Sequence, residues 1–207
     1  MIILGLTGSI GMGKSSTAEM FRALGVPVYD ADASVHELYE KGGAAVGPLS
    51  ERFGDIVKDG AVDRGVLRSK VVDDPEAMKD LEAIVHPLVG LSQMKFRQEA
   101  LESESHFAVL DIPLLYETGG DKRCDYVAVV SAPATVQKDR VLARGEMSEE
   151  QFEAIKAKQM SDAEKRNRAD FLINTAFGFD FARAHVQAIA NLLDGLATGE
   201  SDGGTGS

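Results

Sequence analysis

The sequence predicts an α/β fold of three layers, in which helices cover both faces of a central parallel sheet. Three observations indicate this class. An apolar run at residues 2–7 leads through a glycine-rich loop into a helix, runs at 107–111 and 126–130 are apolar throughout, and the stretches around them are helical. The 207 residues suffice for one core with a small inserted subdomain and are too few for several independent domains.

The N-terminal part is expected to form a strand, a loop, a helix and a second strand. The helix follows the loop through residues 17–24, where three apolar side chains share one face. Gly25 ends this helix, and residues 26–29 are short and β-prone. A second unit of the chain is therefore expected to begin just after this strand.

Residues 33–106 are expected to form a mainly helical insertion. Apolar residues recur with a helical period at 35–39 and 81–85. The glycine pair at 42–43 and Pro75 interrupt the pattern.

The rest of the core is expected at residues 107–133 and 169–197, which join residues 1–32. Between these two parts, residues 134–168 are helical and rich in basic side chains, which predicts a mobile helical lid. Residues 198–207 are polar or glycine, so a disordered tail is expected there.

Charge and cysteine content limit the partners and the compartment. The net charge of −11 opposes binding to nucleic acid or to anionic membranes, so a phosphorylated ligand needs a local pocket. A single cysteine, Cys124, permits no internal disulfide. No apolar stretch approaches a membrane span, and no secretory signal precedes the first strand. We expect a cytoplasmic monomer or small homo-oligomer with no nucleic-acid or membrane partner.

A phosphate-binding loop is the strongest motif. Residues 8–15 match G-x-x-x-x-G-K-[ST] between the first strand and the first helix, which predicts the P-loop NTPase fold. Backbone N–H groups and the helix N-terminus would surround a phosphate, Lys14 would reach the β and γ oxygens, and the Ser15 hydroxyl would bind Mg²⁺. The alternative is a glycine-rich turn that matches by chance, and the strand-loop-helix context favours the site. The expected nucleotide-binding residues here are Gly8, Ser9, Ile10, Gly11, Met12, Gly13, Lys14, Ser15 and Ser16.

The reaction must be inferred from other residues. A regulatory GTPase needs D-x-x-G and N-K-x-D motifs, and the chain contains neither. A kinase needs a carboxylate that orients or deprotonates the acceptor hydroxyl. Asp30 and Asp32 follow the second strand, where α/β sheets bind ligands, although either aspartate is also a favoured helix N-cap.

Five stretches together resemble the dephospho-coenzyme A kinase family. The family's G-L-T-G-x-I-G-x-G-K-S matches residues 5–15, and its V-P-x-x-D-A-D matches 26–32. L-x-x-I-x-H-P matches 81–87, D-x-P-L-L-x-E matches 111–117, and Q-x-x-R matches 137–140. Further positions with family-like spacing are Arg144, Gln159, Lys165, Ala169 and Asp170.

The resemblance implies an ATP-dependent kinase with a nucleotide-binding core, a helical domain for dephospho-coenzyme A and a lid. It implies transfer of the γ-phosphoryl group to the ribose 3′-hydroxyl of dephospho-coenzyme A, the last step of coenzyme A synthesis, with ATP and Mg²⁺ as cofactors. Asp32 would be the base or orienting group, Lys14 would neutralise charge, and Arg140 would clamp phosphate. Arg144 is a second candidate clamp.

On the acceptor side, the resemblance implies that Asp30 and Asp32 lie at the substrate. Arg64, in a D-R-x-x-L match, would meet the acceptor's pyrophosphate, and the alternative is a solvated pair with Asp63. His86 would position the acceptor, although a histidine before Pro87 can simply mark a helix break or restart.

Other candidate positions lie after the third strand and near the last one. Pro113, Leu114 and Leu115 would form an apolar wall of the acceptor site, or alternatively the end of a core strand. Asp111 would touch Mg²⁺ through water, or alternatively cap a helix or turn. Asn174 would lie near the adenine.

One position departs from the family. Many members have an arginine where this chain has Gly90, so one basic contact to substrate phosphate is expected to be absent or supplied elsewhere. Three other functions remain open: a P-loop kinase for another small acceptor, an ATP-binding regulatory module, and an α/β domain with a vestigial loop.

Overall fold

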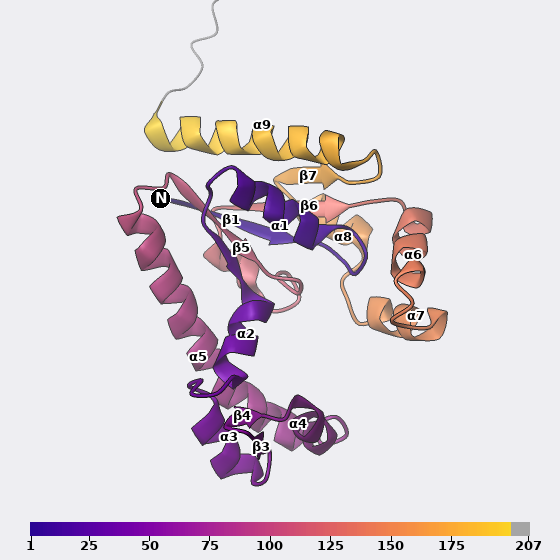
Figure 1. The fold of residues 1–207 in the computed structure, drawn as a ribbon. Coiled ribbons are helices and arrows are strands. Elements are labelled where there is room, and N and C mark those ends of the chain that lie inside the picture. Colours follow the sequence, from indigo (N-terminus) through magenta and orange to yellow (C-terminus); the bar gives the residue numbers. More distant parts are fainter. Residues whose placement is uncertain (200–207) are drawn as a thin grey trace, which may run out of the picture. The chain divides into compact units, whose positions relative to one another are not determined.

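The computed structural model describes residues 1–199, and its contacts divide the chain into two compact units (Figure 1). The first unit joins Met1–Tyr29 to the chain from Ala100 onward, and the second is Asp30–Glu99. No helix within the described residues is both long and apolar enough to cross a membrane.

A five-stranded sheet forms the centre of the first unit, in the order β2-β5-β1-β6-β7. Its strands are β1 (Ile2–Thr7), β2 (Val28–Asp30), β5 (Phe107–Asp111), β6 (Tyr126–Ser131) and β7 (Phe171–Asn174). The pairings of β1 with β5, β1 with β6 and β6 with β7 are all parallel. Every residue of β5 is buried, as its uninterrupted apolar sequence predicts.

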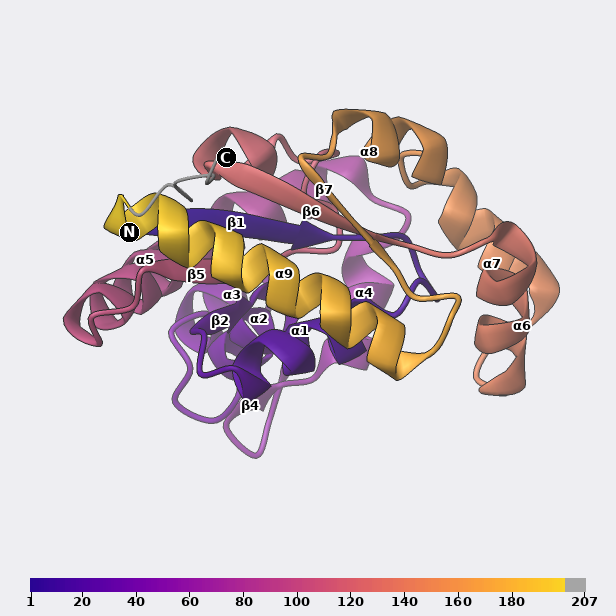
Figure 2. The same ribbon diagram turned by 90° about the horizontal axis from the view of Figure 1, so that it is seen from above.

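Two helices cover one face of this sheet. Helix α1 (Lys14–Ala23) and helix α9 (Phe179–Thr198) pack on each other, and α9 also packs on β7 (Figures 1 and 2). Their buried side chains share one core with alternate residues of β1, β5 and β6, including Leu4, Val109 and Val130.

The opposite face is covered by the segment after β5 and by α8 (Asp162–Arg168). Val127 and Val129 of β6 point to this side and pack with Leu115 and Tyr116. On the same side, β1 carries Gly5. A Cβ atom there would lie 2.7 Å from Leu115 and 2.9 Å from the Cys124 sulfur. The predicted three-layer α/β fold is therefore confirmed.

Three helices follow β6: α6 (Ala134–Ala143), α7 (Glu149–Ala157) and α8. Ser148 and Ser161 begin α7 and α8 with capping boxes, in which side chain and backbone satisfy each other's hydrogen bonds. A short 3-10 helix, η1 (Gly120–Arg123), precedes β6. Helix α9 extends to Thr198, and residues 200–207 of the expected tail lie outside the described part.

The second unit is mainly helical and has its own apolar core. Its helices are α2 (Ala31–Tyr39), α3 (Val46–Phe53), α4 (Arg64–Val71) and α5 (Pro75–Glu102), whose last residues belong to the first unit. Strands β3 (Val57–Lys58) and β4 (Ala61–Val62) pair antiparallel. Asp59 and Gly60 between them both have positive φ, and Asp-Gly is the usual sequence of such a two-residue turn.

The alternative of a helix break or restart at Pro87 is wrong, because α5 continues through this proline. A proline inside a helix frees the carbonyl four residues earlier. That carbonyl belongs to Ala83, which is exposed, so water can solvate it. Val85 and Leu88 pack into the core of the unit and hold the helix on both sides.

Candidate active site

The loop between β1 and α1 takes the form that the phosphate-binding motif predicts. Gly11 and Gly13 both have positive φ, 77° and 93°, which glycine adopts without strain. Gly13 is the N-cap of α1, so the helix begins directly at Lys14. The N-terminus of α1 therefore opens onto this loop, and a helix N-terminus favours a bound phosphate.

Lys14 and Asp111 form an ion pair at this loop. The Lys14 Nζ lies 2.6 Å from Asp111 Oδ1, and the Asp111 side chain is 2% exposed. The pairing of β1 with β5 brings them together, because Asp111 stands opposite Leu6 at the end of β5. A buried carboxylate thus holds the lysine that the motif assigns to the phosphates.

Ser15 and Ser16 occupy the first turn of α1 and are exposed. The Ser15 hydroxyl and the Asp111 carboxylate are hard oxygen donors of the kind that Mg²⁺ takes beside phosphate and water. The donor chemistry of these two residues therefore fits a magnesium ion that accompanies a nucleotide.

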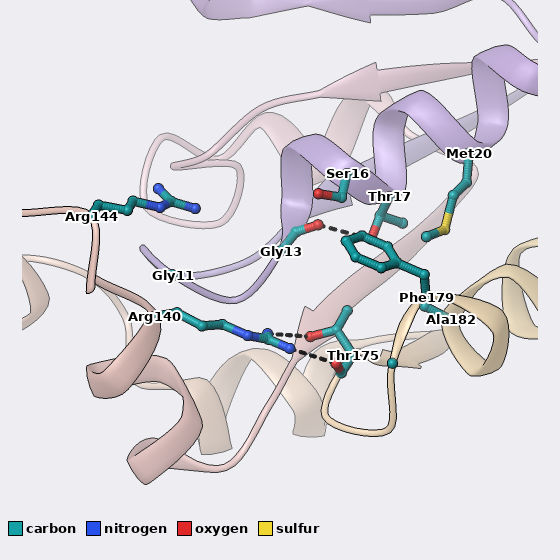
Figure 3. Close-up of a pocket in the computed structure, with 11 residues that line it drawn as sticks. Gly11, Gly13, Ser16, Thr17, Met20, Arg140, Arg144, Thr175, Phe179 and Ala182 are labelled. Atoms are coloured by element: carbon teal, nitrogen blue, oxygen red, sulfur yellow. Dashed lines mark hydrogen bonds between the residues drawn. The ribbon is translucent and has the colours of Figure 1, made fainter. Parts of the chain in front are cut away.

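A cavity of about 250 Å³ adjoins the loop (Figure 3). It is lined by Gly11 and Gly13, by Ser16, Thr17 and Met20 of α1, by Arg140 and Arg144, and by Thr175, Gly178, Phe179 and Ala182. Its walls thus combine loop backbone, two guanidinium groups and an aromatic ring. Ligand pockets commonly have this composition, with apolar walls and a few placed polar groups.

Arg140 is fixed by Thr175 in this cavity. One guanidinium nitrogen donates to Thr175 Oγ1 at 2.9 Å and the other to the Thr175 carbonyl at 2.6 Å (Figure 3). Thr175 Oγ1 in turn donates to the carbonyl of Met12 in the loop, at 2.8 Å. Arg140 is therefore oriented beside the phosphate loop, and Arg144, at the C-terminal end of α6, is exposed at the same cavity.

Asn174 ends β7, and its side chain accepts a hydrogen bond from the Ala176 N–H at 2.9 Å. The cavity is lined instead by its neighbour Thr175 and by Phe179. Neither residue was predicted from the sequence. The available signal was their place directly after the last strand, where α/β sheets bind ligands.

The segment after β5 is held from two sides. The Thr7 hydroxyl donates to the Pro113 carbonyl at 3.0 Å, and the fully buried Lys165 pairs with Glu117 at 2.9 Å. Leu115 is fully buried in the core, which favours the structural alternative for this residue. Leu114 is 41% exposed and offers the accessible apolar surface.

Two pKa values are shifted in this segment. Burial opposes ionisation of Glu117, but hydrogen bonds from Lys165 and the Met160 N–H outweigh it and lower the pKa of the carboxyl. Burial raises the pKa of Tyr116 to about 12, against the opposing effect of Arg168, whose guanidinium lies 4.2 Å from the ring centroid. Glu117 is therefore a permanent anion at neutral pH, and Tyr116 a permanent neutral group.

The remaining candidates belong to the second unit. Asp30 is the N-cap of α2 and accepts from the Ala33 N–H at 2.9 Å, so its capping role is confirmed. Asp32 lies in the first turn of α2 and is exposed. Arg64 begins α4 and His86 lies on α5, and both are exposed.

The surroundings of Asp63, beside Arg64, and of Gly90 bear on their expected roles. Asp63 is the N-cap of α4 and accepts from the Gly65 and Val66 N–H groups, both at 3.0 Å. A Cβ atom at Gly90 would meet no atom within 4 Å, so this part of α5 has room for a larger side chain.

Known proteins resemble this chain over most of its length. The family model described as Dephospho-CoA kinase matches residues 2–178. A dephospho-CoA kinase of Rhodopseudomonas palustris strain HaA2 is 52% identical over 91% of this chain and 94% of its own. The corresponding protein of Ruegeria pomeroyi is 55% identical over 92% of this chain and 94% of its own.

Solved structures share the fold. A protein of Thermus thermophilus is 35% identical with a TM-score of 0.80, over 92% of this chain and 96% of its own. A dephospho-CoA kinase of Campylobacter jejuni has a TM-score of 0.64 at 23% identity, over 92% and 96%, which supports the fold alone. More than half of the residues are identical to those of these relatives over nine-tenths of the chain, in agreement with the intact phosphate loop and its paired lysine. The chain belongs to the dephospho-CoA kinase family.

Proposed function

We propose that this protein transfers the γ-phosphoryl group of ATP to the 3′-hydroxyl of dephospho-coenzyme A, giving coenzyme A and ADP as the last step of coenzyme A synthesis. The observation that carries the proposal is the ion pair of Lys14 and Asp111 at an intact phosphate loop, in a chain of this family. Both groups are charged and converge where a γ-phosphate would lie.

The acceptor oxygen forms a bond to the γ-phosphorus while the bond to the β,γ-bridging oxygen of ATP breaks. We assign the acceptor's proton to Asp32, because the family motif ends there and because the exposed carboxylate is free of the capping role that Asp30 fills. ADP leaves with the electron pair of the broken bond.

Lys14 and Arg140 stabilise the charge that spreads over the transferred group. Lys14 exchanges its Asp111 partner for phosphate oxygens when the nucleotide binds. Arg140 is oriented by two hydrogen bonds to Thr175, so little side-chain entropy remains to be lost when it meets a phosphate.

Magnesium is the expected companion of ATP, and Ser15 and Asp111 would hold it. When bound it would neutralise phosphate charge. The residues Gly8, Ser9, Ile10, Gly11, Met12, Gly13 and Ser16 would contact the phosphates.

The base of ATP would occupy the cavity beside Arg140 and Arg144. Phe179 lines it with a ring that is largely exposed, 67% for the residue, and Met20 and Ala182 add apolar surface. A flat aromatic ring and a guanidinium plane are both suited to stack on a purine. Asn174 would not contact the base itself but would hold the turn at Thr175, through its hydrogen bond from the Ala176 N–H.

On the acceptor side, we assign Arg64, His86 and Leu114 to dephospho-coenzyme A, with Pro113 beside Leu114. All except Pro113 are exposed, so their side chains are accessible to a substrate. Leu115 would support this surface from the core. We also infer a cytoplasmic location, which the single cysteine of the chain, Cys124, favours.

A coupled ADP-release assay tests the function. The reactions contain ATP, Mg²⁺ and either dephospho-coenzyme A, adenosine, AMP or no acceptor. Release that depends on dephospho-coenzyme A is the expected result. Equal release in all four reactions, or none in any, would contradict the acceptor assignment.

A further inference from the structure

Ile10 of the phosphate loop is held through both of its main-chain groups by glutamines from distant segments. Gln137 of α6 donates its Nε2 hydrogen to the Ile10 carbonyl at 2.7 Å. The Oε1 of Gln159, between α7 and α8, accepts from the Ile10 N–H at 3.2 Å. Neither glutamine has a place in the proposed chemistry.

Gln137 belongs to a tightly packed contact between α6 and the loop. Gln137 is 2% exposed. A Cβ atom at Gly11 would lie 2.6 Å from Val141 Cγ2 and 3.0 Å from the Gln137 carbonyl, so the loop backbone rests directly on α6. In addition, Met12 Sδ accepts from the Ala132 N–H just before α6. Helix α6 and the loop therefore form one packed body.

Gln159 makes a contact of another kind. A cavity of about 300 Å³ is lined by Ser9 of the loop and by Glu153 and Lys156 of α7, so α7 faces the loop across open volume. Gln159 follows this helix, and its N–H donates to the Lys156 carbonyl at 3.1 Å. Its amide thus ties the end of α7 to the loop beside a space that is not filled by packed side chains.

We propose that Gln137 and Gln159 are positioning residues for phosphoryl transfer, which act through Ile10 and have different effects. Gln137 fixes the peptide groups next to Gly11, where a glycine leaves the backbone free to rotate, and so preorganises the loop for phosphate. Gln159 couples the α7 segment to the loop and acts when that segment lies over the reacting groups. The inference rests on the proposed function, because both residues serve the same phosphate site.

The two roles are separable by measuring ATP binding and turnover independently. Gln137→Leu leaves the Ile10 carbonyl without its buried donor, and we expect Mg²⁺-ATP affinity to fall about tenfold. Gln159→Leu should change that affinity less than about twofold while lowering kcat about tenfold, the effect of an interaction made mainly in the transition state. ATP affinity is measured by calorimetric titration without any acceptor.

A matched control and a conservative variant isolate the contact itself. Gln187→Leu makes the same substitution on α9, where the Gln187 amide donates to its helical neighbour Asn191 at 2.9 Å, and it should change neither constant. Amide hydrogen exchange at Ile10 should accelerate in Gln159→Leu. It should stay slow in Gln159→Glu, which keeps a carboxylate acceptor for the same N–H.

Coupling between the two residues gives the decisive result. Gln137 and Gln159 both act on Ile10, so the effect of the double variant on kcat/KM should depart from the product of the two single effects. The effect of either variant combined with Gln187→Leu should equal the product of the single effects. Independent effects, or unchanged Ile10 exchange in Gln159→Leu, would overturn the proposal. If Gln137→Leu fails to fold, the Gln159 variants and the exchange measurement decide alone.

A failure of the proposed function is recognised separately. In that case the wild-type protein releases no ADP with dephospho-coenzyme A, while the ATP titrations and the Ile10 exchange still report on the two glutamines.

Discussion

The two units of the chain present their candidate residues in opposite ways. In the first unit, Lys14, Arg140 and Asp111 are held by named partners before any ligand arrives. In the second unit, Asp32, Arg64 and His86 are exposed. The first unit thus holds its candidate phosphate-binding groups through internal contacts, whereas the second unit presents exposed side chains that a substrate can reach.

Lys14 offers the strongest test of this contrast, because it serves both the site and the fold. Lys14→Ala should lower kcat/KM about 10³-fold, since it removes a cation from the transferred phosphate. It should also lower the free energy of unfolding by about 3 kcal/mol, because the buried Asp111 carboxylate loses the Lys14 cation. Steady-state kinetics and urea denaturation measure the two effects.

The control is the double variant Lys14→Met with Asp111→Asn. Neutralising both members should restore much of the stability and none of the activity. A double variant as unstable as Lys14→Ala would show that the pair contributes packing rather than charge.

Asp32 tests the other unit. Asp32→Asn should lower kcat about 10²-fold, because the acceptor hydroxyl loses its base. ATP affinity and the free energy of unfolding should stay at the wild-type values, since the side chain is exposed. Asp30→Asn is the matched control, and it keeps an N-cap side chain while retaining most of the activity. Near-normal turnover in Asp32→Asn would move the base elsewhere.

Arg140 tests whether orientation by Thr175 matters for transfer. Arg140→Lys should lower kcat about tenfold, because a lysine cannot reproduce the two hydrogen bonds to Thr175 that orient the guanidinium. KM for dephospho-coenzyme A should change little. A change confined to that KM would assign Arg140 to the acceptor site.

Glu117 gives the smallest effect, a difference in how stability depends on pH. The pKa of Glu117 is lower in the folded protein than in the unfolded chain, so the unfolded chain binds more protons as the pH falls. The Glu117 carboxylate therefore stabilises the protein above the unfolded-state pKa of about 4.5. This stabilisation is lost as the pH falls through the lower folded-state pKa. The free energy of unfolding of the wild type should therefore decline more steeply below about pH 5 than that of Glu117→Gln. Urea denaturation between pH 3 and pH 7 compares them, and parallel curves would contradict the assignment.

The fold and the phosphate loop were predictable because their signals are local. Uninterrupted apolar runs identify β5 and β6, and the spacing of Gly8, Gly13 and Lys14 identifies the loop before α1. The same locality explains the failure at Pro87, because the helix is maintained there by core contacts that no short pattern records. The turn at Asp59 and Gly60 did have a local signal, and we overlooked it.

Partners that meet across long stretches of chain were not predictable. The bonds of Arg140 to Thr175 and of Gln159 to Ile10 join segments that are 35 and 149 residues apart. Sequence patterns identified Arg140, Ile10 and Gln159 as family positions, but only the packed structure shows which residue each of them contacts. For the same reason, the burial of Leu115 emerged only from the structure.

Gly5 shows that a family signature also records packing. It is the first residue of the motif that ends at Ser15, yet it faces Leu115 and Cys124 on the sheet side away from α1. We therefore expect the volumes of positions 5, 115 and 124 to change together among relatives, with bulk gained at one position lost at another. One position of the motif that identifies a nucleotide-binding protein is thus constrained by the space available between two layers of the fold, and not by the nucleotide.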